Sequence, residues 1–242
     1  MVDEGIDVRA LARCFVCVLV AVVLGGCAAQ SLVYQSADAQ SVPVEPTVLL
    51  LPPDVVISRL NAGGNTEPEA DWSEAVSGAL MASLREHFWS SGVEFVEYGE
   101  SLADRDIGMI RQLNTQLDAI ELRLLKERLG MASLGGDRDY FLGESEMGHL
   151  RNQDKAYLLM VVLKANRATS GRMVTAVLAS FAGAAIETNS LQFRSALIDL
   201  RDGHVKWANF DDQALAEVGD VLNADEKKWA RAVEHLLRDF PL

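Results

Sequence analysis

The chain has few cysteines, and all of them lie close to its start. Cys14, Cys17 and Cys27 are the three among 242 residues. Residues 28–242 can therefore form neither a disulfide framework nor a thiolate metal site. Cys14 and Cys17 have the spacing of a redox pair, but both lie within an apolar stretch, so we interpret that spacing as coincidental.

Long apolar runs and positive charge are also scarce. No apolar stretch reaches the roughly 20 residues that a membrane-spanning helix needs. The chain has 22 basic and 35 acidic residues, which gives a net charge of −13. Such a chain is poorly suited to nucleic acid, whose phosphates bind Lys and Arg, and it has no basic patch for anionic headgroups. We therefore expect no nucleic-acid partner.

The sequence contains none of the common catalytic or nucleotide-binding motifs. It has no H-E-x-x-H, G-x-S-x-G, P-loop or G-x-G-x-x-G pattern. Acidic clusters at 67–71 and 137–146 lack the spacing of a calcium loop, which favours solvated loop charge. The four histidines are not spaced as metal ligands. His87 lies near the end of a predicted helix, where the helix dipole favours a cation, so it has a structural explanation. We expect no catalytic residue, metal or cofactor. The histidines are His87, His149, His204 and His235.

What the sequence does contain is an apolar segment that ends in a short motif. Residues 15–24 are all apolar, Arg9 and Arg13 precede them, and Leu24-Gly25-Gly26-Cys27 ends the segment. Its length fits the central region of a signal peptide. The motif resembles the lipobox of bacterial lipoproteins, which implies cleavage before Cys27 and attachment of lipid to that cysteine.

This resemblance divides the chain into three parts. Residues 1–26 are predicted to be a lipoprotein signal peptide, although three of the first seven residues are acidic. Residues 27–46, which are small and polar with two prolines, are predicted to be a tether. Residues 47–242 are predicted to form a single domain, and cleavage leaves a net charge of −12. An ordinary secretory signal and a buried apolar helix remain the alternatives for the N-terminal segment.

Beyond residue 47, strand-like and helix-like patterns alternate. Continuous apolar runs predict buried strands, and apolar residues every three or four positions predict helices. Asp71 and Glu74 have the pattern of a capping box. Two alternatives remain open for the second predicted helix, residues 107–124: it packs only on the sheet, or it packs on the sheet and also contacts a partner. The order is therefore β-α-β-α-β-β-β-α, an α/β (α+β) fold with a mixed sheet and flanking helices. The predicted segments are strand 48–51, helix 71–91, strand 93–98, helix 107–124, strands 156–166, 190–200 and 204–212, and helix 224–239.

A hairpin is predicted where Arg201-Asp202-Gly203 joins two apolar runs, because Asp and Gly tolerate positive φ. The residues from Leu197 to Trp207 resemble the L-x-D-x-x-x-G-x-x-x-W hairpin of certain periplasm-facing lipoproteins. The strand ending in Leu50-Leu51-Pro52-Pro53 and the helix led by Asp71-Trp72 belong to the same resemblance. These lipoproteins have a fold like the N-terminal domain of TolB and include CsgG and LpoB. The resemblance implies that Asp199 and Gly203 build the turn and that Trp207 covers the sheet. It also implies action by binding partners or assembling, without catalysis in this domain.

The segment Met173–Ile186 has no charged residue among its fourteen. Three structures remain open for it: a crossover helix that covers the core, an exposed element that contacts membrane or protein, and a pair of pore-forming strands. Pore strands alternate apolar and polar residues, whereas Thr175 and Ser180 fall out of phase. Our hypothesis is a helix or loop that mediates contact.

These patterns together predict a non-enzymatic lipoprotein on the periplasmic face of the Gram-negative outer membrane. Ala28 follows Cys27 where an Asp is the usual retention signal, which by analogy favours the outer membrane. The expected partners are the membrane, through lipid on Cys27, and other envelope proteins, with homo-oligomers left open. The alternatives are a secretion-pore subunit like CsgG and an envelope hydrolase with a carboxylate site that the sequence does not reveal.

Overall fold

The computed structural model describes residues 32–36, 47–98, 104–131, 140–141, 150, 157–181, 183–186, 188–210 and 220–241. The chain divides into two units, Met1–Gln30 and Ser31–Leu242, and every described residue belongs to the second. The predicted signal peptide, the motif Leu24–Gly26 and Cys27 therefore lie outside the described residues.

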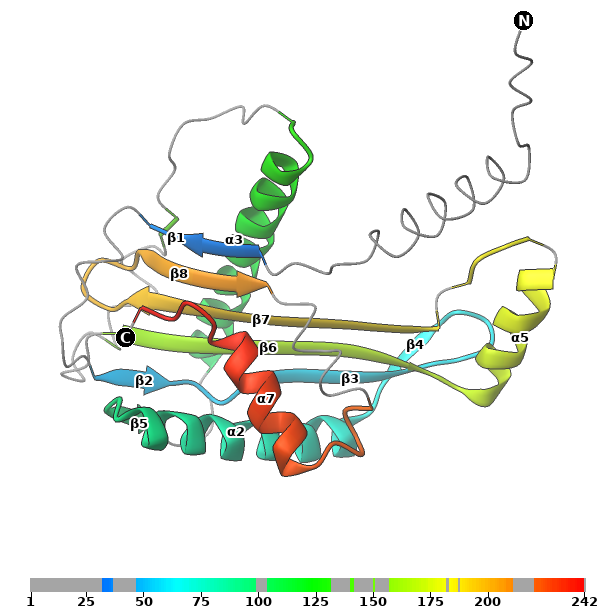
Figure 1. Cartoon of the computed structure of the whole chain (residues 1–242), viewed down its shortest axis with the longest axis horizontal. Coiled ribbons are helices and arrows are strands. Elements are labelled where there is room, and N and C mark those ends of the chain that lie inside the picture. Colours follow the sequence, from blue (N-terminus) through cyan, green and yellow to red (C-terminus); the bar gives the residue numbers. More distant parts are fainter. Residues whose placement is uncertain are drawn as a thin grey trace, which may run out of the picture. The chain divides into compact units, whose positions relative to one another are not determined.

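The described residues form four helices and one mixed eight-stranded sheet, so the predicted α+β class is confirmed (Figure 1). The elements in chain order are β1 (Leu32–Gln35), β2 (Val48–Leu50), β3 (Asp54–Leu60), β4 (Thr66–Pro68), α2 (Ala70–Ser91), β5 (Phe95–Glu97), α3 (Asp104–Arg128), β6 (Tyr157–Ala168), α5 (Ser170–Phe181), β7 (Asn189–Asp199), β8 (Val205–Phe210) and α7 (Glu226–Leu236).

Strand β6 is the centre of the sheet, whose order is β1-β8-β7-β6-β2-β5. One edge of β6 pairs antiparallel with β7 along eleven residues. Its other edge pairs parallel with β2 near Tyr157 and then with β3 from Val162 onward. The predicted continuous apolar strand is thus a central strand, with paired strands on both edges and helices on both faces.

Helices cover both faces of the sheet. Side chains of β6 alternate, so that Tyr157, Leu159 and Val161 join one core with α2 and α7. Leu158 and Met160 join the other core with α3. This alternation is the ordinary consequence of a two-residue period in a strand, and it explains why β6 needs apolar residues at consecutive positions.

The tether predicted for residues 27–46 is wrong in its middle part, because Leu32–Gln35 is strand β1 at the sheet edge. It pairs antiparallel with β8, with Leu32 opposite Phe210 and Gln35 opposite Trp207. Tyr34 is buried and lies edge-on to Tyr140 with ring centroids 5.5 Å apart. Such a short strand has little local signal and depends on its partner for stability.

Helix α2 begins one residue before the predicted position. Glu69 is its N-cap, and the Glu69 side chain accepts no capping hydrogen bond. Asp71 lies inside the first turn, so the predicted capping box is wrong. The Ser73 hydroxyl instead accepts the Ile57 N–H (2.9 Å) and donates to the Glu69 carbonyl (2.9 Å). Gly92 ends the helix in the left-handed region, as expected. The apolar stripe is buried as predicted: Val76, Leu80, Leu84 and Phe88.

The β7–β8 hairpin has the turn that its sequence predicts. The Gly203 N–H donates to the Asp199 carbonyl (2.8 Å), and Gly203 has φ 76°. The Asp199 carboxylate is buried and accepts the Arg201 N–H (2.9 Å), while the Asp202 carboxylate accepts the His204 N–H (2.9 Å). Asp199, Asp202 and Gly203 therefore build the turn.

Replacing Gly203 with alanine is expected to lower the free energy of unfolding by about 1–2 kcal/mol, because a side chain is strained at positive φ. Gly78 is the matched control, because it lies inside α2 and the Cβ of an alanine at this position would meet no neighbouring atom within 4 Å. Gly78→Ala is expected to stabilise the protein by about 0.5–1 kcal/mol. Urea unfolding followed by circular dichroism measures both changes, and equal signs for the two variants would contradict this account of the turn.

Candidate functional site

The hairpin residues that the sequence singled out have structural roles. Arg201 forms an ion pair with Asp199 (2.6 Å), and this hydrogen-bonded contact raises the pKa of Arg201. Trp207 has no exposed surface and lies edge-on to Phe240, with centroids 5.2 Å apart. These side chains hold the turn and the core together and leave no open site at the hairpin.

Three of the four histidines, His87, His204 and His235, lie within the described residues. Burial lowers the pKa of His87, with Glu234 acting in the opposite direction. His204 lies beside the Phe141 ring, and His235 contacts Arg238. Among the described residues no three His, Cys, Asp or Glu side chains gather as metal ligands. His149 lies outside the described residues.

The first acidic cluster forms ion pairs at the β3–β4 hairpin. Glu67 and Glu69 both lie near the Arg59 guanidinium, at 3.3 and 2.8 Å. These contacts are exposed, and pairs of this kind contribute little to stability. The second cluster, 137–146, lies outside the described residues except for positions 140–141.

A cavity of about 300 Å³ lies on the sheet face that carries α3, further along strands β3, β6 and β7 towards α5. The Asn166 amide donates to the Ser190 hydroxyl (2.7 Å) on its floor, and the exposed Lys164 stands beside them. The cavity has no carboxylate, so it does not provide the acid pair that the hydrolase alternative requires. Its lining is Val56, Ser58, Lys164, Ala165, Asn166, Ser190 and Gln192.

The most unusual element is α5, which joins β6 to β7 beyond the ends of both strands (Figure 1). The Thr169 N–H donates to the Leu60 carbonyl (2.9 Å), and the Thr169 hydroxyl accepts the Arg172 N–H (3.3 Å). At the other end the Ala184 N–H donates to the Ala179 carbonyl (2.9 Å), next to Gly183 at φ 77°. Both ends of the helix are thus fixed by backbone contacts.

The side chains of α5 are arranged with the large apolar ones turned outward. None of its residues is buried. The half-buried positions are the polar or small residues Arg172, Thr175, Ala176 and Ala179, and Gly171 lies close to Ala62. The exposed apolar residues form one stripe, with exposures of 46% for Met173, 60% for Val174, 53% for Val177, 64% for Leu178 and 85% for Phe181.

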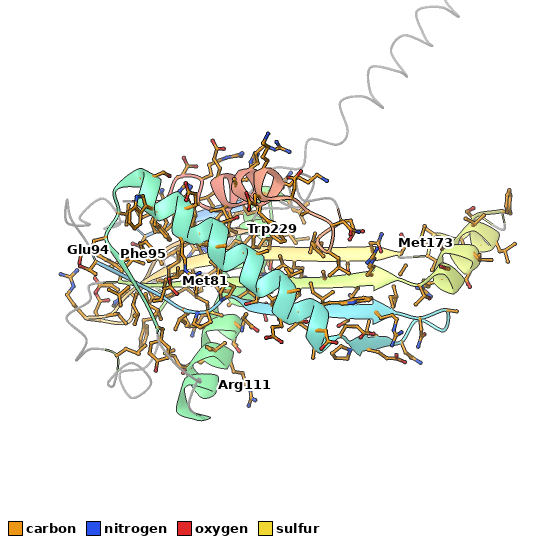
Figure 2. The ribbon with its side chains drawn as sticks, turned by 90° about the horizontal axis from the view of Figure 1, so that it is seen from below. Met81, Glu94, Phe95, Arg111, Met173 and Trp229 are labelled. Atoms are coloured by element: carbon orange, nitrogen blue, oxygen red, sulfur yellow. The ribbon has the colours of Figure 1, made fainter. Side chains whose placement is uncertain are left out.

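Figure 2 shows Met173 on α5 at the end of the strands, away from Met81 of α2 and Trp229 of α7. The usual soluble helix turns its apolar side to the core, so α5 has the opposite arrangement. We refer to Met173, Val174, Val177, Leu178 and Phe181 as the α5 stripe.

The structure decides between the three alternatives for Met173–Ile186. The core-covering helix is wrong, because α5 buries no residue. The pore-forming strands are not formed, because Ser170–Phe181 is helical. The exposed helix of our hypothesis is what the structure has. The sequence identified the apolar segment but not the side of the helix that faces solvent.

No described helix is both long enough and apolar enough to cross a bilayer. Comparisons with protein-family models, curated proteins and solved structures found no match for this chain. The candidate site is the α5 stripe, an exposed apolar surface defined by its geometry.

Proposed function

We propose that this chain is a non-enzymatic lipoprotein, anchored through Cys27 on the periplasmic face of the Gram-negative outer membrane, which binds or assembles with other envelope proteins. The observation that carries the proposal is the motif Leu24-Gly25-Gly26-Cys27, whose Leu24 is the last of the ten apolar residues 15–24. The resemblance of the β7–β8 hairpin to that of TolB-like periplasmic lipoproteins supports the same class.

Exposed apolar side chains support a role in contact. Large apolar patches on a soluble domain are typical of interaction sites. Besides the α5 stripe, the last turns of α3 and the turn directly after it expose Leu122, Leu125 and Leu129 by 52, 43 and 63%. These three positions follow a helical period of three and four, which is the spacing that a partner helix or groove binds. They favour the alternative in which α3 packs on the sheet and also meets a partner.

Lipidation is tested by the intact mass of the chain and by incorporation of labelled palmitate. We expect a mature protein that begins at Cys27, carries acyl chains and incorporates palmitate, and we expect Cys27→Ser to abolish that incorporation. The control is Cys17→Ser, which changes a cysteine inside the signal segment and is expected to leave palmitate incorporation unchanged.

Two results would contradict the proposal. Equal palmitate incorporation by Cys27→Ser and the wild-type chain would show that lipid is not attached to Cys27. Crosslinking in intact membranes that recovers no envelope protein above background would remove the partner role.

A further inference from the structure

The α5 stripe is suited to a lipid surface. Helices that lie in the membrane interface have one apolar face, which sits at the boundary of headgroups and acyl chains. On α5 that face consists of five large apolar side chains that point away from the domain. Phe181, the most exposed of them at 85%, ends the helix. Bilayer contact would bury this surface without requiring a partner of matching shape.

The charge around α5 differs from that of the rest of the chain. Helix α5 carries one basic residue, Arg172, and no acidic residue, although the whole chain has a net charge of −13. The adjoining β3–β4 turn, Asn61–Asn65, has no charged residue. The charged residues beside them are paired, Arg167 with Asp220 and Arg59 with Glu67 and Glu69. Because anionic headgroups repel acidic surfaces, α5 and this turn meet less repulsion from a membrane than an acidic surface would.

The lipid anchor can lie at the same end of the sheet. Leu32 is opposite Phe210, which is itself opposite Arg194. From Arg194, strand β7 extends five residues to Asn189 beside α5, a distance of about 17 Å. Five residues also separate Leu32 from Cys27, and they can span at most about 18 Å. Because β1 runs away from α5, the chain enters it from the α5 side, and its covalent length allows Cys27 to come level with the helix.

From these three observations we propose that α5 lies in the headgroup region of the bilayer that carries the Cys27 anchor, with the α5 stripe inserted among the lipids. The inference rests on the proposed lipidation of Cys27 and adds a second contact that fixes the orientation of the domain. A second copy of the chain fits less well, because stable protein interfaces use about 20–30 residues from each partner, whereas α5 has 12 residues in all.

The experiment uses a fluorescent probe on the lipidated full chain. Leu178→Cys provides a thiol within the α5 stripe, and an environment-sensitive dye is attached to it. Trp89→Cys is the matched control, because Trp89 is also apolar and 83% exposed but lies at the end of α2 beside β5. Both proteins are reconstituted in vesicles of phosphatidylethanolamine and phosphatidylglycerol, with and without a lipid that carries a nitroxide quencher.

We expect a blue shift, a several-fold gain in fluorescence and strong nitroxide quenching at position 178, with none of these at position 89. A probe at 178 that stays in water, or a chain that does not float with the vesicles, overturns the proposal. A probe that is shielded but not quenched indicates a protein contact, such as a second copy, and also overturns it.

A separate control tests the proposed lipidation of Cys27. The wild-type chain undergoes the same labelling, and it is expected to take up no dye because the Cys27 thiol is acylated. Dye uptake and a mass without acyl chains would refute lipidation, whereas a wild-type chain that takes up no dye, together with a probe at position 178 that stays in water, would refute only the contact of α5 with lipid.

Discussion

Trp207→Ala is expected to lower the free energy of unfolding by about 3–5 kcal/mol, the range for removing a large aromatic side chain from a packed core. Trp207 has no exposed surface and belongs to the core shared with α2 and α7. Its ring lies edge-on to Phe240, which in turn lies 5.9 Å from Phe88. Truncation removes contacts to both the sheet and the C-terminal segment. Urea unfolding of the detergent-purified chain, followed by circular dichroism, measures the loss.

Trp207→Phe is the matched control. Phenylalanine keeps an aromatic ring beside Phe240 and removes the indole N–H, which has no hydrogen-bond partner among the described residues. Phenylalanine is smaller than tryptophan and leaves a small cavity, so Trp207→Phe is expected to cost stability but clearly less than Trp207→Ala, which removes the whole ring. If the two variants were equally stable, packing of this ring would not be what Trp207 contributes.

The second large effect is expected at the ion pairs that join α3 to β7. The Arg194 side chain is only 8% exposed, and its guanidinium lies 2.5 Å from a carboxylate oxygen of Asp118 and 2.5 Å from one of Glu121. The double variant Asp118→Asn, Glu121→Gln leaves that cation without either anion. We expect it to lose about 2–4 kcal/mol, near the lower part of the range for breaking buried pairs because Asp118 is partly solvated.

A further substitution separates charge from packing. Replacing Arg194 with methionine in the double variant removes the uncompensated cation and keeps apolar contact with Phe210, whose ring the guanidinium overlies at 5.9 Å. Part of the lost stability should therefore return, as it does when buried ions give way to apolar residues. If this third substitution destabilised the protein further, the attraction between these charges would not be the cause of the first loss.

The sequence could predict elements whose signal is local. The consecutive apolar residues of β6 and the Asp202-Gly203 turn carry their own explanation, since one needs burial on both faces and the other needs positive φ. Strand β1 has no such signal. Its four residues form a strand because β8, far along the chain, offers an edge.

The burial of polar residues inside strands also could not be predicted from local sequence. Ser195 and Asn209 are fully buried, which their strand patterns do not explain. In the structure the Ser195 hydroxyl and the Asn209 amide donate to the Leu236 carbonyl, at 3.0 and 2.9 Å. They satisfy a carbonyl at the end of α7, where no intrahelical partner exists. The pairing spans about forty residues of sequence, so no local pattern could reveal it.

The sequence predicts the apolar composition of the candidate site but not which side of α5 faces solvent. The charge-free segment that contains α5 stands out in the sequence, and its apolar residues fall on one side of a helix. Which side faces the strands depends on the close approach of Gly171 to Ala62 and on Thr169 at the helix start. Small residues permit that approach, and the large ones are consequently left outside.

The position of β1 also has a mechanical consequence. A pull on the N-terminal end of the chain acts first on Leu32, and thus on the hydrogen bonds between β1 and β8. Tension along the strand loads those bonds together, whereas tension across it breaks them one after another. If β1 peels away, the free length before Val48 grows to twenty-one residues from Cys27, or about 70 Å when taut. The pairing of β1 with β8 is therefore the contact of the described sheet that such a pull loads first.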